Sequence, residues 1–140
     1  MNATAADMVA TLDASLDAVE RGRLDELAST EILHPEIEWT SAIGSVLGGG
    51  SYRGREGAGE WLGDLSGTSQ RLRWRDRDWR VLGDELILLL ARFEMQGKAS
   101  GAAVENELGA VFELTDGLIR RVTTYHSHAE ALAAAETISA

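Results

Sequence analysis

Hydrophobic positions near the start of the chain recur at intervals of three and four residues, which is the spacing of one face of a helix. They are Val9, Leu12, Leu16 and Val19. Gly22 follows them as a helix-ending residue, and Leu24 and Leu27 indicate a short second helix. The chain is therefore predicted to begin with two helices, the first of them amphipathic.

After these helices the pattern changes to alternation. Pro35 is incompatible with a helix interior, and the hydrophobic residues Ile37 and Trp39 alternate with polar neighbours, which predicts a strand. Residues 44–54 are rich in glycine and predict a loop, whereas residues 56–65 predict a weak helix. One strand, a loop and a short helix thus precede the second half of the chain.

From residue 68 to about residue 127 the pattern indicates strands throughout. Turn-forming pairs and runs divide this stretch into four antiparallel segments, and they lie at residues 83–84, 97–101 and 116–117. Residues 129–138 are rich in alanine and predict a final helix. We therefore predict an α+β fold, with an antiparallel sheet and helices in one domain of residues 1–140.

Two details of the strands predict more than their existence. The hydrophobic positions change parity between Trp74 and Trp79, so we expect a β-bulge near residues 76–78. The strand of residues 86–95 is hydrophobic on both faces, which places it in the centre of the sheet. Because we expect helices on one face only, a second copy of the chain should cover the other face, which predicts a homodimer.

The charge of the chain argues against two classes of partner. The formal net charge is −10, so neither nucleic acid nor an anionic membrane is expected to bind. Four arginines alternate along one predicted strand: Arg71, Arg73, Arg75 and Arg77. Because Asp76 and Asp78 lie among them, we expect these arginines to form an exposed, self-compensated edge of the sheet.

Composition restricts the chemistry further. The chain has no cysteine, which excludes disulfides, thiolate nucleophiles and cysteine metal sites. No apolar run approaches the length of a membrane span, and the first residues do not resemble a secretion signal, so we expect a cytoplasmic protein. His126 and His128 are two apart, with His34 as a remote third ligand, but the remaining metal ligands cannot be named, and we expect neither a metal nor a cofactor.

Several motifs resemble the SnoaL-like branch of the nuclear transport factor 2-like superfamily. They are residues 34–39 (HPEIEW), 52–57 (YRGREG), 115–121 (TDGLIRR) with Tyr125, and 129–132 (AEAL). The resemblance extends over most of the chain and includes the order of the predicted elements. It implies a curved sheet packed with helices into a cone around a central pocket. The family contains ketosteroid isomerase, polyketide cyclases, limonene epoxide hydrolase and many members without assigned chemistry.

Arg92 and Glu94 are the first catalytic candidates. They share one face of the predicted central strand, in a row otherwise formed by leucines. The spacing is similar to that of the epoxide hydrolase branch, where an arginine bridges an acid and a base, and this resemblance implies that Glu94 moves protons while Arg92 tunes it. The alternative is a solvated pair near the end of the strand.

His126 is the third catalytic candidate. The family's acidic residue near the end of the last strand has no counterpart at residues 124–127, and His126 is a natural replacement as a general base near neutral pH. The alternative is a histidine that simply ends the strand or caps the last helix.

The candidate ligand-binding residues are mainly aromatic: Trp39, Tyr52, Trp61, Trp74, Asn106 and Tyr125. Aromatic walls suit a flat apolar ligand, although core packing explains most of these side chains equally well. Tyr52 could donate a hydrogen bond to a ligand oxygen. Asn106 shares parity with inward-facing hydrophobic positions and could orient a carbonyl or a water, or it could be a solvent-facing edge residue.

The leading hypothesis is a pocket protein that binds a small apolar, oxygen-bearing molecule. As an enzyme it would perform cofactor-free acid–base chemistry such as isomerisation, cyclisation or epoxide hydrolysis. The alternative is a non-catalytic ligand-binding or dimerisation module, in which Arg92 and Glu94 form a structural bridge. The two hypotheses differ in whether a titratable group faces the pocket.

Overall fold

The structure is a computed structural model that describes residues 5–21, 33–40, 51–54, 69–97 and 103–139. Its elements, in chain order, are α1 (Ala5–Glu20), β1 (Leu33–Thr40), β2 (Ser51–Arg53), β3 (Ser69–Val81), β4 (Leu86–Gly97), β5 (Ala103–Thr115), β6 (Leu118–Tyr125) and α5 (His128–Ser139). The fold is α+β, as the sequence predicts. The predicted helices at residues 24–27 and 56–65 and most of the loop at 44–54 lie outside the described residues. The loop prediction is wrong for Ser51–Arg53, because these residues pair with β1 as the strand β2.

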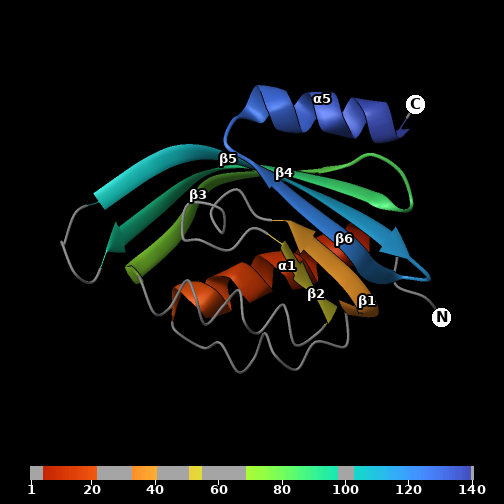
Figure 1. The fold of residues 1–140 in the computed structure, drawn as a ribbon, viewed down its shortest axis with the longest axis horizontal. Helices are drawn as coiled ribbons and strands as arrows, with labels where there is room; N and C mark the ends of the chain where they lie inside the picture. Colours follow the sequence, from red (N-terminus) through yellow and green to blue (C-terminus); the bar gives the residue numbers. More distant parts are fainter. Residues whose placement is uncertain (1–4, 22–32, 41–50, 55–68, 98–102, 140) are drawn as a thin grey trace.

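The strands form one curved sheet in the order β2-β1-β6-β5-β4-β3 (Figure 1). The four strands β3 to β6 are antiparallel neighbours in sequence order, which confirms the predicted meander. β1 pairs antiparallel with β2 but parallel with β6, a pair that the sequence analysis did not anticipate. β1 and β6 can pair in parallel because most of the chain connects them, whereas a hairpin would make the pair antiparallel.

A β-bulge interrupts β3 where the change of parity predicts it. The register with β4 jumps from Arg75 opposite Arg92 to Asp78 opposite Leu90, and Asp76 has a positive φ of 53°. The extra residue turns Arg77 to the opposite face from Arg75. The expected single row of exposed arginines is therefore wrong at Arg77, because the bulge shifts every later side chain by one position.

Both faces of the sheet are covered by helices of the same chain. The face toward α1, here the inner face, carries a core that includes Leu89, Phe112 and Val122. The outer face packs against α5 through a second cluster that includes Leu88 and Val111. In Figure 1, α1 lies below the sheet and α5 above it.

The expectation that helices cover one face only is thus wrong, because α5 lies on the outer face. The reason is visible at Gly109: a Cβ atom there would lie 2.2 Å from Cβ of Ala131, so only glycine lets α5 approach β5 this closely. Because α5 covers the outer cluster, no partner subunit is needed there. The homodimer stays a prediction. None of the described helices is long and apolar enough to cross a membrane.

The start of α5 is fixed to the sheet by hydrogen bonds. The backbone N–H of His128 donates to Glu107 Oε1 at 2.9 Å, and Nε2 of His128 lies 2.7 Å from the carbonyl oxygen of Ala91. Ala91 stands opposite the bulge and has no register partner in β3. The imidazole of His128 therefore bonds a carbonyl of the central strand at the place where the bulge disturbs the ladder.

Candidate functional site

A groove of about 640 Å³ lies between α1 and the edge strand β3, on the inner face of the sheet. Its walls combine small and aliphatic residues of α1 with two tryptophans and three charged side chains. They are Ala6, Val9, Ala10, Asp13, Trp74, Asp76, Arg77 and Trp79. The groove is open to solvent.

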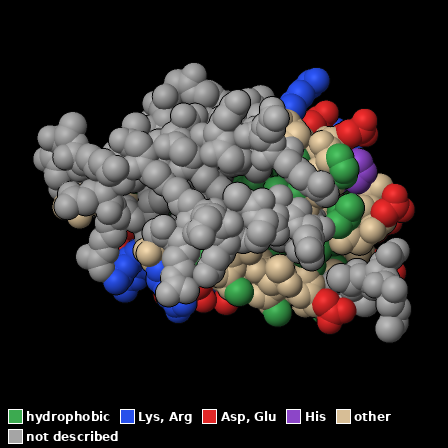
Figure 2. All heavy atoms as spheres, turned by 90° about the horizontal axis from the view of Figure 1, so that it is seen from below, with side chains coloured by type: hydrophobic (Ala, Val, Ile, Leu, Met, Phe, Trp, Pro, Cys, Tyr) green, Lys and Arg blue, Asp and Glu red, His purple; other side chains and the backbone are tan. Residues whose placement is uncertain are grey.

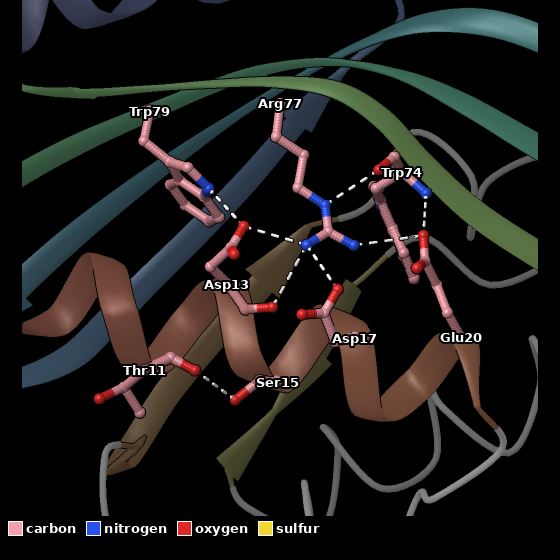
Figure 3. A network of polar contacts seen from close by, with 8 residues as sticks. All are labelled: Thr11, Asp13, Ser15, Asp17, Glu20, Trp74, Arg77 and Trp79. Carbon is pink, nitrogen blue, oxygen red and sulfur yellow. Dashed lines mark hydrogen bonds and ion pairs between the residues drawn. The ribbon is translucent and has the colours of Figure 1, made fainter.

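Arg77 is the centre of the polar network beside this groove (Figure 3). Its Nη1 donates to Asp13 Oδ1 at 3.0 Å and to Asp17 Oδ1 at 2.9 Å, and its Nη2 lies 3.2 Å from Glu20 Oε1. Its Nε donates to the carbonyl oxygen of Trp74 at 2.9 Å. The side chain is only 13% exposed, so these contacts satisfy a largely buried guanidinium.

The three carboxylates come from one face of α1. Asp13, Asp17 and Glu20 are spaced by four and three residues, which places them on one side of the helix. Figure 3 shows them rising from α1 toward Arg77 on β3. Because the bulge turns Arg77 inward, α1 and β3 meet through charges.

Two tryptophans connect this network to the core. Nε1 of Trp79 donates to Asp13 Oδ1 at 2.8 Å, and the backbone N–H of Trp74 donates to Glu20 Oε1 at 2.6 Å. The Trp79 ring lies 5.9 Å from that of Phe112, and the Trp74 ring 5.3 Å from that of Phe93, measured between centroids. The indole of Trp79 is therefore held by a polar and an aromatic contact, whereas Trp74 is held through its backbone N–H and its ring contact.

The surroundings keep Asp13 ionised. Partial burial alone would raise the pKa of this carboxyl, but hydrogen bonds from Trp79 and Arg77 and the charge of Arg77 outweigh the burial and hold the pKa below its ordinary value. Burial likewise opposes the charge of Arg77, yet hydrogen bonds with Asp13 and Asp17 raise the pKa of Arg77 further above neutrality. At neutral pH the groove thus contains a fixed carboxylate beside a fixed guanidinium.

One oxygen of Asp13 is left for a ligand. Oδ1 accepts the hydrogen bonds from Trp79 and Arg77, and no described residue bonds to Oδ2. The side chain is 43% exposed, so a molecule in the groove can reach the carboxylate. The arrangement can accept a hydrogen bond from a hydroxyl group while an indole lies against the rest of the molecule.

Arg92 and Glu94 lie elsewhere, on the outer face of β4. They share a face as expected, but they are not paired with each other. Arg92 Nε donates to Glu105 Oε1 at 2.6 Å, and Glu94 Oε1 accepts from Arg75 Nη1 at 2.8 Å. Arg92 is 47% exposed, and α1 with its groove lies on the other side of the sheet.

The structure also separates the other polar candidates from the groove. His126 is exposed between β6 and α5, and Asn106 is exposed opposite Phe93 in the register of β4 and β5. Tyr125 packs against the outer cluster, where burial, followed by the charges of Glu113 and Glu130, raises the pKa of its phenol. None of these three side chains lines the groove between α1 and β3.

Of the aromatic candidates, Trp74 lines the groove and Trp39 packs against the inner core. Tyr52 lies opposite Trp39 in the pairing of β2 with β1. Trp61 lies outside the described residues. The structure therefore brings one of the predicted aromatic residues, Trp74, into this groove.

The polar network beside the groove was not predicted from the sequence. The missed residues are Asp13, Asp17, Glu20, Arg77 and Trp79. The sequence contains two signals for these residues. Acidic residues at helical spacing on α1 require a cation, and the predicted bulge implies that one arginine of the row faces inward. Within the described part of the chain, no group of three or more histidine or acidic side chains is arranged to hold a metal ion.

Charged side chains of both signs are visible on the side of the molecule that carries α1 (Figure 2). Figure 2 looks at the molecule from below the view of Figure 1 and shows Asp and Glu side chains at several places around the margin, with most visible Lys and Arg side chains gathered at one end. This distribution agrees with the net charge of −10. An uncharged or weakly polar ligand is therefore favoured over an anion on this side.

Comparison with known proteins places the chain in a family. Residues 12–122 match the SnoaL-like domain family. Among proteins with curated descriptions, none matches the sequence.

Three solved structures illustrate the similarity. An NTF2-like protein of unknown function from Burkholderia pseudomallei has a TM-score of 0.71 at 19% identity, over 91% of this chain and 95% of that one. A putative polyketide cyclase from Xanthomonas campestris has a TM-score of 0.69 at 20% identity, over 89% and 93%. TerC, co-crystallised with polyporic acid, has a TM-score of 0.69 at 18% identity, over 91% and 97%.

At these identities the solved structures establish a shared fold, and the family match covers most of the sequence. The chain belongs to the SnoaL-like family, and it shares its fold with NTF2-like proteins.

Proposed function

We propose that this protein binds a small, flat, apolar molecule that carries a hydroxyl group, in the groove between α1 and β3. The observation that carries the proposal is the position of Asp13, an ionised carboxylate between Arg77 and the indole of Trp79, at the border of a hollow of about 640 Å³. Hollows of this size are typical of small-molecule sites, where apolar walls provide contact area and a few polar groups fix the orientation.

The walls of the groove match such a ligand. Trp74 and Trp79 offer aromatic surface, and Val9 with its alanine neighbours offers aliphatic surface on the opposite side. The hydroxyl would donate to Oδ2 of Asp13, the oxygen to which no described residue bonds. Because Arg77 and Trp79 already hold the carboxylate, little side-chain freedom would be lost on binding.

The names of two structural relatives support a small-molecule role. TerC was co-crystallised with polyporic acid, and the Xanthomonas campestris protein is a putative polyketide cyclase. These names belong to those proteins, and for this chain they support only the general proposal that the fold takes up a small molecule.

Cofactor-free acid–base chemistry, such as isomerisation, cyclisation or hydrolysis, is the second candidate, and the name of the putative cyclase favours it. In this groove Asp13 would be the base. Its lowered pKa makes it a weak proton acceptor near neutral pH, and Arg92 and Glu94 lie on the other face of the sheet. Binding is therefore the function that the groove supports better.

Binding of 2-naphthol and naphthalene tests the proposal, because the two molecules share a flat ring system and differ in the hydroxyl group. Quenching of tryptophan fluorescence should show that 2-naphthol binds about tenfold more tightly than naphthalene, since a hydrogen bond to a charged acceptor contributes about 1.5 kcal/mol or more. Asp13→Asn should remove most of this preference. Arg92→Gln, on the outer face, is the matched control and should leave it unchanged.

Equal binding of both molecules to the unaltered protein would refute the proposal. The same holds if folded Asp13→Asn protein, checked by circular dichroism, keeps the full preference for 2-naphthol. Cytoplasmic location and a homodimer remain proposals about the setting of this function, and sedimentation equilibrium would test the second.

A further inference from the structure

A second hollow, of about 510 Å³, lies at one end of the sheet on the side of α5. It is bordered by the turn between β3 and β4, the end of β5, the start of β6 and the last turn of α5. Its lining includes the apolar side chains of Leu82, Leu86 and Ile138 and the charged side chains of Glu85, Glu113, Arg120 and Arg121. In Figure 1 this is the right-hand end, where the end of α5 lies above the two turns.

Arg120 enters this hollow from a second bulge. The register between β5 and β6 passes from Glu113 opposite Arg121 to Leu114 opposite Ile119, which leaves Arg120 as the extra residue of β6. Nη1 of Arg120 is buried and has no hydrogen-bond partner among the described residues. A buried donor on a charged group that lacks an acceptor is unfavourable, so this atom calls for an acceptor from outside the described chain.

The neighbouring charges do not provide that acceptor. Glu113 lies 3.9 Å from Nη1 of Arg121, and Nη2 of Arg121 lies 3.3 Å from Glu38. The arginine next in sequence is thus matched by two carboxylates, while no ion pair to Arg120 is formed within the described part of the chain. The charge of Arg120, which lines the hollow, thus has no carboxylate partner among the described residues.

Apolar side chains also line the hollow, beside its charged residues. Leu86 belongs to the buried outer cluster, whereas Leu82 is 40% exposed and Ile138 is 42% exposed, unusually high values for large hydrophobic side chains in this structure. A bound apolar chain would cover both of them. The hollow therefore combines one unmatched cation with an uncovered hydrophobic surface.

We propose that this hollow binds a small amphipathic carboxylate of the medium-chain fatty acid class. The guanidinium of Arg120 would donate to the carboxylate, for which its planar fork is suited. The hydrocarbon chain would lie along Leu82, Leu86 and Ile138. A head group with a single negative charge fits better than a phosphate, because Glu113 lies nearby and would repel a second charge.

Calorimetric titration with decanoate and decanol, both below their micelle or solubility limits, tests this proposal on the full chain. The two probes share a hydrocarbon chain and differ in the charge of the head group. Decanoate should bind at least about tenfold more tightly than decanol, because the hydrogen bond to Arg120 is charge-assisted. Arg120→Met should abolish this preference, whereas Arg121→Met, the adjacent arginine, should change it by less than about threefold.

The stability of Arg120→Met separates a ligand site from a structural role. Removing a buried donor that has no partner should leave the melting temperature unchanged or raise it. A lower melting temperature would show that Arg120 has a structural partner and would overturn the proposal, as would equal binding of decanoate and decanol to the unaltered protein.

Ile138→Glu provides a second test on a partly exposed position, where a folding defect is not expected. It should weaken decanoate binding about tenfold through loss of apolar contact and through charge repulsion, and unchanged binding would contradict the proposed position of the hydrocarbon chain. Asp13→Asn should leave decanoate binding unchanged, so failure of this proposal and failure of the groove proposal can be told apart.

Discussion

The two faces of the sheet hold their helices by different means. On the inner face, α1 packs through Met8, Leu12 and Leu16, and the carboxylates of its second half add ion pairs to Arg77. On the outer face, α5 is attached by close approach, with Ala131 packed directly over Gly109. α1 carries charges where it meets the edge strand β3, and ion pairs attach it there. α5 crosses the centre of the sheet, and small residues attach it there.

Arg75 and Arg77 show a similar contrast between the two faces within one strand. Arg75 is exposed and pairs with Glu94, one partner on the outer face. Arg77 is largely buried and contacts three carboxylates on the inner face. Because of one extra residue in β3, Arg75 forms a solvated ion pair, whereas Arg77 belongs to a network that holds α1 against the sheet.

The largest expected effect is that of Arg77→Met, which leaves Asp13, Asp17 and Glu20 close together without their cation. We expect a loss of about 2 to 3 kcal/mol of unfolding free energy at neutral pH, at the lower end for broken buried ion pairs because two of the carboxylates are partly exposed. Urea denaturation measures it. Arg80→Met, on the same strand, should cost about 0.5 kcal/mol or less, and equal losses in both variants would contradict the special role of Arg77.

A somewhat smaller effect is expected for Gly109→Ala. The new Cβ cannot lie 2.2 Å from that of Ala131, so α5 must move away from the sheet, at a cost of about 2 kcal/mol. The same denaturation experiment on the double variant Gly109→Ala/Ala131→Gly should recover part of this loss. Strictly additive losses would show that the two positions are not in contact in solution.

The smallest effect, and the one that depends on pH, is that of Asp13→Asn. At neutral pH we expect a loss of about 1 kcal/mol, since the side chain is 43% exposed and solvent screens its charge. The folded-state pKa of Asp13 lies below its ordinary value, so its contribution is complete above about pH 4 and is lost as the pH falls through the lowered pKa. The stability difference between variant and unaltered protein should therefore narrow in acid, and a difference that widens would disprove the assignment.

The sequence predicted the framework well because periodicity reports which faces are buried. The bulge near Asp76, the meander and the shared face of Arg92 and Glu94 all follow from alternation along strands. The groove could not be predicted in the same way, because its charges come from α1 and β3, and periodicity does not show which helix crosses which strand. α5 can cover the outer face because Gly109 leaves room for Ala131. The sequence alone does not show that these two residues are in contact.

The parallel pairing of β1 with β6 has a consequence for the order of folding. The strands β3 to β6 are joined by short connections and can pair as soon as each turn closes, whereas Trp39 must wait for Val122 to be synthesised before the two strands can align. During synthesis on the ribosome, β1 and β2 would therefore stay without their main neighbour until nearly the whole sheet has emerged. The last step is the insertion of β6 between two parts of the sheet made at opposite ends of translation.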